Sequence, residues 1–340
     1  MKSLPSVPLA LFLLTSACDA AYSPKVVKVE YQPAEQGLDD KEWSMAYNDN
    51  DQLIRVEYEL NGREEVEYSY RYDDNGDFIE FNEETNSGEV VGNYTRENGF
   101  IVSVSSETAW SASTVICSNG KVDLDGDGKS DVIWEEGVLV GVEHSNEISG
   151  SCATGASPIS IAFEVDSSDT IRWSEGLVVN SSSEERSVVR RSSGGDISFE
   201  EDERKEVDVD FNYSNGALVD IEASVESELD GDRSKSSEDL DFTFDDDNRV
   251  TEIDSEFRDS DGEIKGDHEI EYDSDGNIRR IEDRSGNRWE ISYAEGQTSG
   301  VVFSLHNIFL GGHQFRLDGS VSSSFAKGNL VSLKGIPMIR

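Results

Sequence analysis

Basic residues and long apolar runs are both scarce in this chain of 340 residues. Lys and Arg total 29 against 72 Asp and Glu, which gives a formal net charge of −43. Because phosphate groups would be repelled, we expect no nucleic-acid partner, and binding to an anionic membrane surface is disfavoured for the same reason. Beyond the first residues, no apolar run is long enough to span a bilayer as a helix. So acidic a surface suits cation binding, or a salty medium that screens self-repulsion.

Cysteine is also rare, with three residues in the chain, and the first of them follows a targeting segment. Residues 1–17 carry a basic residue near the start, Lys2, followed by an apolar core and then small residues, as secretory signals do. The stretch Leu14-Thr-Ser-Ala-Cys18 resembles the lipobox of bacterial lipoproteins, with Thr15 where an aliphatic residue is usual. This resemblance implies lipidation of Cys18 and anchoring to the inner or outer membrane, in the periplasm or at the cell surface. Ordinary cleavage nearby, releasing a soluble protein, is the alternative.

The other two cysteines are Cys117 and Cys152. In an exported protein they most simply pair, closing a loop of about 35 residues and contributing about 2–4 kcal/mol of stability. Two free thiols are the alternative. Their spacing does not fit a Cys-x-x-Cys redox or zinc motif.

Helix signals are nearly absent, and a period of two runs through most of the chain. In one example, Val56, Tyr58 and Leu60 alternate with Glu57 and Glu59. This alternation is typical of a strand with one face buried and one face in water. The sequence therefore predicts an all-β fold: an antiparallel meander of β-hairpins that forms one large twisted sheet, a sandwich or an open barrel.

A short unit recurs along the chain, in which an aromatic residue is followed by two or three turn residues and usually Gly. The copies are Tyr72–Gly76, Trp134–Gly137, Trp173–Gly176, Tyr213–Gly216 and Tyr272–Gly276, with Asn in place of Gly in Phe244–Asn248. Gly and Asn both tolerate the positive φ that tight hairpin turns need. The spacing between copies drifts, so the unit is not a strict solenoid repeat.

The fullest copy runs from Tyr272 to Tyr293 and contains Tyr272-Asp273, Gly276-Asn277 and Gly286-Asn287. It resembles the YD repeats of Rhs proteins, teneurins and bacterial wall-associated proteins. The resemblance implies β-hairpins that join into a long meander, which coils into a shell in that family. A shell around a toxin takes far more repeats, so only the hairpin architecture is expected to carry over.

The most specific motif is Asp123-Leu-Asp-Gly-Asp-Gly-Lys-Ser-Asp131. Oxygen ligands at loop positions 1, 3, 5, 7 and 9 would come from Asp123, Asp125, Asp127, the Lys129 carbonyl and Asp131. Several hard oxygen ligands in one loop suit Ca²⁺ better than a transition metal. The stretch resembles the calcium loops of FG-GAP and VCBS repeats and of dockerins. An acidic hairpin turn without an ion is the alternative.

Signals for catalysis are poor, because the chain contains no Gly-x-Ser-x-Gly elbow, phosphate-binding Gly loop or His-Glu-x-x-His. We divide the chain into a signal peptide at 1–17, a tether at 18–40 and a hairpin-repeat domain at 41–296. A segment at 107–155 holds the predicted disulfide and calcium loop, and apolar, cationic capping strands follow at 297–340.

The function predicted from these features is that of a non-catalytic, calcium-stabilised lipoprotein of the cell envelope, acting as a scaffold or binding module. One alternative is a secreted calcium-dependent hydrolase acting on polysaccharide or peptide. Another is a subunit of an envelope complex that docks through residues 297–340. The expected partners are the membrane, through the N-terminal lipid, and a glycan or an envelope protein.

Overall fold

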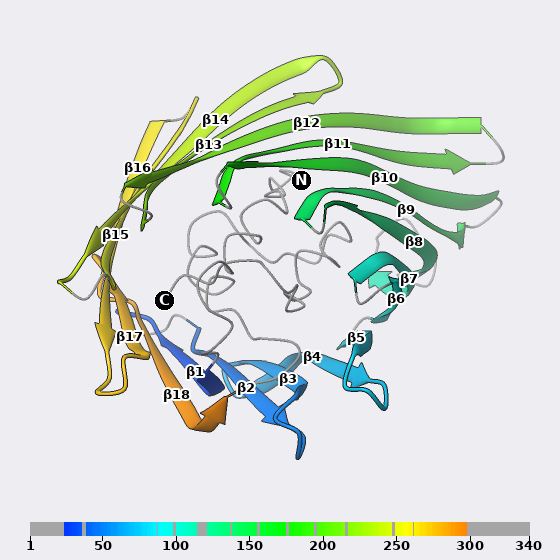
Figure 1. Cartoon of the computed structure of the whole chain (residues 1–340). Helices are drawn as coiled ribbons and strands as arrows, with labels where there is room; N and C mark the ends of the chain where they lie inside the picture. Colours follow the sequence, from blue (N-terminus) through cyan, green and yellow to red (C-terminus); the bar gives the residue numbers. More distant parts are fainter. Residues whose placement is uncertain are drawn as a thin grey trace.

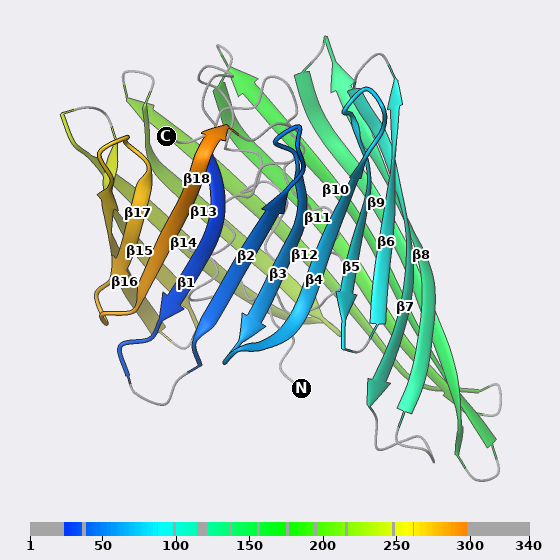
Figure 2. The same cartoon turned by 90° about the horizontal axis from the view of Figure 1, so that it is seen from below.

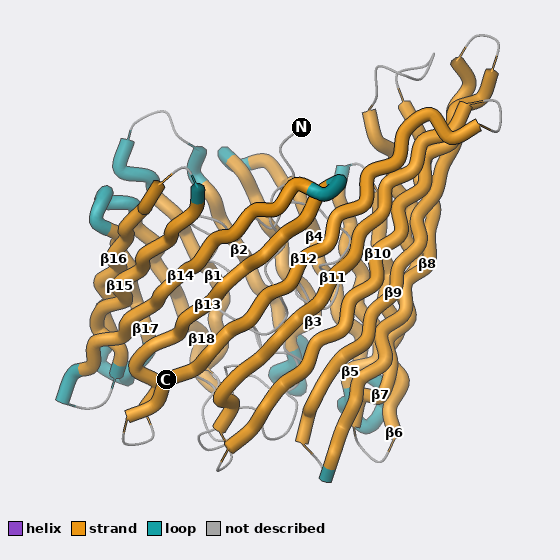
Figure 3. Tube along the Cα trace, turned by 90° about the horizontal axis from the view of Figure 1, so that it is seen from above, coloured by secondary structure: helices purple, strands orange, loops and turns teal. Residues whose placement is uncertain are grey.

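The computed structural model describes residues 24–297, except for 36–38, 87, 98–99, 114–120, 137, 155–156, 175–176, 194–195, 215–216, 247–248 and 261. Eighteen β-strands lie in these ranges, and no helix is present among them (Figure 3). The described part of the chain therefore holds no helix that could cross a membrane. Over these ranges the prediction of an all-β chain is confirmed.

The strands follow one another along the chain with short connections. The first nine are β1 (Pro24–Gln32), β2 (Lys41–Tyr47), β3 (Leu53–Leu60), β4 (Arg63–Tyr72), β5 (Phe78–Thr85), β6 (Gly88–Glu97), β7 (Phe100–Ser113), β8 (Lys121–Glu135) and β9 (Val138–Thr154). The other nine are β10 (Ser157–Ser174), β11 (Leu177–Ser193), β12 (Asp196–Ser214), β13 (Ala217–Leu229), β14 (Asp232–Phe244), β15 (Val250–Asp259), β16 (Gly262–Tyr272), β17 (Ile278–Asp283) and β18 (Arg288–Gln297).

The sheet closes on itself. Every strand pairs antiparallel with the next one, and β1 also pairs with β18, with Val29 opposite Ile291 and Tyr31 opposite Trp289. Figure 1 shows the resulting ring of strands. The predicted sandwich and the predicted open sheet or barrel are therefore wrong. Closure pairs the backbone groups that an open sheet would leave at its two edges.

The strand that closes the barrel comes from the predicted tether at 18–40. Val26 and Val29 of β1 are buried at 4% and 0% exposure, so this segment belongs to the wall. The predicted capping strands at 297–340 lie outside the described residues except for Gln297, the last residue of β18. They were expected to cover an open edge, and a closed barrel has no such edge.

The wall is much taller on one side than on the other. Strands β9 to β12 contain 17 to 19 residues each, whereas β17 contains six. At about 3.3 Å per residue, the long strands extend well beyond their neighbours, and Figure 2 shows them projecting on one side of the barrel.

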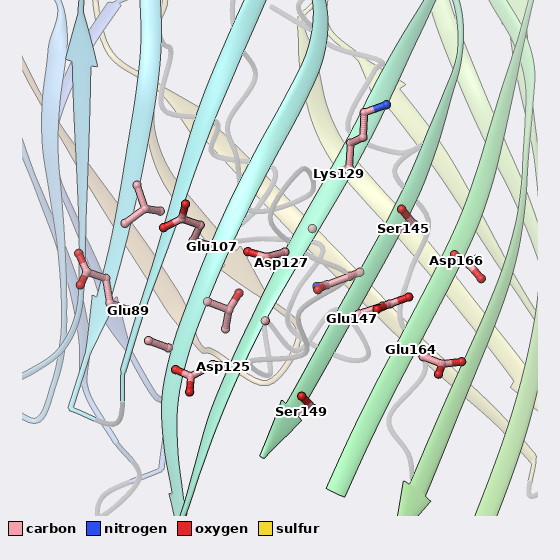
Figure 4. A pocket seen from close by; sticks show the side chains of 16 residues that line it. Glu89, Glu107, Asp125, Asp127, Lys129, Ser145, Glu147, Ser149, Glu164 and Asp166 are labelled. Carbon is pink, nitrogen blue, oxygen red and sulfur yellow. The ribbon is translucent and has the colours of Figure 1, made fainter. Parts of the chain in front are cut away.

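The apolar side chains lie on the inner face of the wall. Twenty-six buried residues form one hydrophobic cluster, to which every strand contributes at least one side chain. Along each strand these side chains alternate with charged ones, and Figure 4 shows the charged side chains of β6 to β10 on the outside of the wall, so the cluster lies on the inner face. Charged residues fill the alternate, outer positions; for example, Arg55 and Glu57 flank the buried Val56.

The recurring aromatic unit forms one rim of the barrel. Six aromatic residues in the C-terminal halves of even-numbered strands, four of them from the recurring unit, each donate a hydrogen bond to a carbonyl of the preceding strand. The pairs are Tyr47–Val26, Tyr72–Leu53, Trp134–Ile101, Trp173–Leu139, Tyr272–Val250 and Tyr293–Ile278, with donor–acceptor distances of 2.7 to 2.9 Å. The aromatic position of the unit thus fastens neighbouring hairpins together.

The Asp that follows the Tyr organises the turn. The side chain of Asp273 accepts hydrogen bonds from the backbone N–H groups of Asp275 and Asn277, both at 2.9 Å, and Gly276 has φ of +83°. An L-residue with a side chain would be strained at that φ. Local turn chemistry therefore explains the Tyr-Asp-x-x-Gly pattern without any wider repeat architecture.

Candidate functional site

A shallow groove of about 750 Å³ crosses the outer face of the wall from β6 to β10. Carboxylates dominate its lining, and Figure 4 looks onto them from outside the barrel. The acidic residues at the groove are Glu89, Glu107, Asp125, Asp127, Glu147, Glu164 and Asp166, and Lys129 is the basic one. The groove is therefore a strongly acidic concave surface.

The residues of the predicted calcium loop lie in this region, on strand β8. Asp123, Asp125, Asp127, Lys129 and Asp131 occupy alternate positions, so their side chains stand in a row on the outer face. Side chains at alternate positions of a strand lie roughly 6–7 Å apart, whereas a calcium loop folds its ligands around one point. The loop geometry expected from the sequence is therefore wrong, and calcium binding itself stays a prediction.

A second row of acids runs across the strands. Glu107, Asp127, Glu147 and Glu164 lie directly opposite one another on β7 to β10. Directly opposed side chains on one face have Cβ atoms about 5 Å apart, and like charges there are destabilising. Glu164 is neutralised by Arg190, whose Nη1 lies 2.5 Å from its carboxylate. The row is therefore a concentration of like charge on the outer face.

Among the described residues, one group of acids converges closely enough to hold a metal ion. The carboxylates of Glu57, Glu64 and Glu67 on β3 and β4 have oxygens within 4.8 Å of one another. Arg55 forms ion pairs with two of these glutamates, because its Nη2 lies 2.5 Å from both Glu57 and Glu67. This cluster therefore has its own counter-charge within the chain.

The inner face carries a polar belt that the sequence reasoning missed. Ser130, His144, Ser167, Glu185 and Lys205 lie opposite one another from β8 to β12. Their row lies between the main hydrophobic cluster and a smaller one formed by Leu124, Ile148, Cys152, Ile161 and Phe163. The sequence does contain a signal for this belt, because polar residues stand at positions of β8 to β12 where the alternation predicts inward-facing apolar side chains.

Hydrogen bonds satisfy this belt only in part. Ser130 Oγ lies 2.8 Å from His144 Nδ1, but His144 Nε2 is buried without a partner. Both amide atoms of Asn146 and the hydroxyl of Thr108 are also buried and unpartnered, at residue exposures of 3% and 4%. A Cβ at Gly128 would lie 2.4 Å from Ser106 Oγ and 3.5 Å from Asn146 Cγ, which places these side chains on the same inner face.

Burial perturbs the ionisable groups of the belt and of the next inward-facing row, where Asp169 lies opposite Val142. It raises the pKa of Asp169 to about 6, although Ser183 donates a hydrogen bond to the carboxylate. Burial lowers the pKa of Lys205 to about 8, against the opposing effect of Glu185 and Glu203. Burial also lowers the pKa of His144, which keeps the ring neutral near pH 7. Such perturbed groups are more typical of binding sites than of a plain barrel wall.

Two predicted site residues lie outside the described ranges. Cys18 precedes the first described residue, and Cys117 falls in 114–120. Cys152 is near the end of β9, beside the smaller hydrophobic cluster. Lipidation of Cys18 and the Cys117–Cys152 disulfide therefore stay predictions.

No family model and no curated protein matches the chain. Two solved structures similar to it are porin-like proteins of Bacteroides vulgatus and Bacteroides uniformis, 9% and 8% identical, with TM-scores of 0.35 and 0.28. Each match covers 80% of this chain, together with 100% and 99% of the matched chain, respectively. Likeness at these scores says nothing about activity.

The family resemblances expected from the sequence are wrong. The hairpins of this chain close into one barrel, and the stretch that resembled a calcium loop is a continuous strand. The Tyr-Asp-x-x-Gly unit reflects turn chemistry and the aromatic hydrogen bonds at the rim.

Proposed function

We propose that this chain is a non-catalytic protein of the cell envelope whose barrel faces water on its outside and binds its ligand at the inner wall. A second part of the proposal is that lipid on Cys18 holds the barrel at a membrane. The observation that carries the proposal is the orientation of the wall, with charged side chains outside and apolar ones inside. A barrel inserted in a bilayer needs the opposite orientation, with an outward apolar band.

Ion pairs on the outer face support a water-facing barrel. They bridge neighbouring strands around much of the wall: Lys28–Glu42, Arg55–Glu67, Arg71–Glu80, Arg190–Glu164, Arg186–Asp202, Lys235–Glu226, Arg258–Asp239 and Lys265–Glu256. A single Arg or Lys on the lipid face of a barrel costs about 2–4 kcal/mol at the bilayer midplane. In water such exposed pairs are nearly neutral in energy, so this surface is compatible with solvent.

The geometry of the inner belt favours binding over catalysis. Among the described residues, Ser130 and His144 most resemble a catalytic serine with its general base. However, it is Nδ1 of His144 that lies beside the serine hydroxyl, and Nε2 has no partner. In a catalytic triad the second ring nitrogen is held by a carboxylate that fixes the tautomer and stabilises the imidazolium. Without that hydrogen bond, the pair lacks the orientation needed for proton transfer.

Fractionation of cells that produce the full-length chain tests the proposal. The unmodified protein should sediment with membranes, and Cys18→Ser should move the folded barrel into the soluble fraction without detergent. A matched Ser16→Ala change, two residues before the lipidation position, should leave the protein with the membranes. If the Cys18→Ser protein still needs detergent for extraction, the barrel is held by lipid contacts along its wall and the proposal fails.

A further inference from the structure

The large apolar side chains of the inner wall are buried from solvent. Phe78 and Phe81 are each 2% exposed, Phe211 is 3% exposed and Trp289 is 5% exposed. These side chains project further from the sheet than their smaller neighbours do, so neighbours in the same wall cannot cover their tips. A wall that lined a water-filled lumen would leave these rings open to solvent.

The width of the barrel rules out coverage by the opposite wall. With neighbouring strands about 4.8 Å apart and tilted by about 40°, a barrel of this strand number has a diameter of about 35 Å. Two sheets whose side chains meet lie only about 10 Å apart, and Figure 1 shows a ring of strands, not two sheets pressed together. The inner wall is therefore covered by something other than the wall itself.

The segment that follows β18 has the composition needed to cover this wall. Residues 298–340 lie outside the described residues, and they form the most apolar stretch of the mature chain. They carry a net charge of +3, from four Lys and Arg against one Asp, whereas the rest of the chain carries −46 because the total is −43. Aromatic residues recur along the segment, at Phe303, Phe309, Phe315 and Phe325.

The segment also has the length and the starting point to enter the barrel. It follows Gln297, four residues beyond the rim residue Tyr293, so it leaves the wall at the aromatic rim. An extended chain of 43 residues reaches about 140 Å, whereas β12, with 19 residues, is about 60 Å long. The other undescribed parts of the mature chain contain seven residues or fewer, which is too short to cover an inner wall of this size.

We infer that residues 298–340 fold back into the barrel and are the ligand of its inner wall. The inference names the ligand of the proposed function and rests on its water-facing barrel. Apolar side chains of the segment would pack on the hydrophobic cluster to which every strand contributes. The positive charge of the segment is complementary to the inner wall, where Glu83 and Asp169 are buried at 5% and 7% exposure.

Photo-crosslinking of the full-length protein locates the segment. The probe is p-benzoylphenylalanine in place of Phe309, which keeps an aromatic ring at this position. Its crosslinks should map to inward-facing residues such as Val142 and Val209, which are each 1% exposed. Their sequence neighbours Glu143 and Asp208 face outward and are the matched control positions. Crosslinks to the outward positions, or to a second chain, would overturn the inference.

Trypsin cleavage after Arg316 measures how tightly the segment is held. In the folded, unmodified protein this cleavage should be slow, because the protease reaches only the released segment. Phe309→Asp should speed it by about tenfold or more, since a charge would face the apolar wall. Phe309→Leu is the control, because it stays apolar and should leave the cleavage slow. All five Trp precede residue 298, so intrinsic fluorescence reports whether the barrel itself remains folded.

Fast cleavage after Arg316 in the unmodified, folded barrel would also overturn the inference. Neither this measurement nor the crosslinking depends on the folding of the Phe309→Asp protein. The proposed function fails on a different result, namely a Cys18→Ser protein that still needs detergent for extraction. The two failures are therefore distinguishable.

Discussion

The hydroxyl of Tyr72, at the end of β4, donates a hydrogen bond to the carbonyl oxygen of Leu53, at the start of β3, over 2.9 Å. The tyrosine ring also packs beside Phe78, with ring centroids 5.8 Å apart. One side chain thus joins the hydrogen bonding of one hairpin to the packing of the next. The same relationship recurs around the rim, so the recurring sequence unit is a means of fastening hairpins into a ring.

Replacing this hydroxyl should therefore weaken the rim. Tyr72→Phe should lower the free energy of unfolding by about 1 kcal/mol, because the Leu53 carbonyl loses its donor while the ring contact stays. The measurement is urea-induced unfolding followed by intrinsic fluorescence. Tyr58→Phe is the control, since the half-buried Tyr58 packs on Trp43 and no described contact involves its hydroxyl. Equal effects of the two changes would contradict a role for the hydrogen bond.

The sequence predicted this local chemistry well, because the information is local. Alternation identified the strands, and the Asp and Gly positions identified the turns. Closure could not be predicted in the same way. It depends on pairing between β1 and β18, in which Val29 lies opposite Ile291 although more than 250 residues separate them in the sequence. Nothing in the sequence of either strand indicates which other strand it pairs with.

The acidic stretch at 123–131 shows why turn chemistry misled the prediction. Gly128, at position 6 of the expected calcium loop, would allow a sharp turn. Gly126 and Gly128 instead occupy inward positions of β8 where a neighbouring strand comes close. A Cβ at Gly126 would lie 2.3 Å from the carbonyl oxygen of Glu147. The glycines therefore serve close packing within the sheet. The regular spacing of charges at every second residue was the better guide, since it is the period of a strand.

Close packing of another glycine gives a second prediction. A Cβ on Gly92 of β6 would lie 2.0 Å from the ring of Phe81 on β5, because the ring lies over the glycine. Gly92→Ala should destabilise the barrel by about 1–3 kcal/mol, as overpacking of a core does. Combining it with Phe81→Leu should recover part of that loss, since the smaller side chain makes room. Strictly additive effects in denaturant unfolding would count against this contact.

The row of opposed acids on β7 to β10 gives a third prediction. Glu147 lies between Asp127 and Glu164, so Glu147→Gln should raise the melting temperature by relieving like-charge repulsion of about 0.5–1 kcal/mol. The gain should shrink in about 1 M sodium chloride, where the screening length falls to about 3 Å. Glu271→Gln, which removes a partner of Arg279 and Arg280, should show no gain.

The same experiment tests the calcium prediction. Ca²⁺ bound at the acidic groove, which includes Asp125 and Asp127, would raise the melting temperature above that in sodium chloride of equal ionic strength, because an ion that binds only the folded state stabilises it. Asp125→Ala and Asp127→Ala would then abolish the rise. If calcium and sodium salts act alike at equal ionic strength, the row is a repulsive surface that is screened without a bound ion.

The buried Asp169 gives a prediction about pH. Its folded pKa of about 6 lies above the ordinary value of 3.8, so the folded state binds the proton more tightly than the unfolded state between these values. Asp169 should therefore make stability fall as the pH rises from about 4 to about 6, by about 3 kcal/mol at most. Asp169→Asn should remove this contribution, so that its gain over the unmodified protein grows across that interval and levels off above it. Asp125→Asn, on the exposed outer face, corrects for the general effect of removing one acid. Chemical unfolding at several pH values measures all three proteins, and a gain for Asp169→Asn that does not change with pH would show that the carboxylate is solvated in the folded barrel.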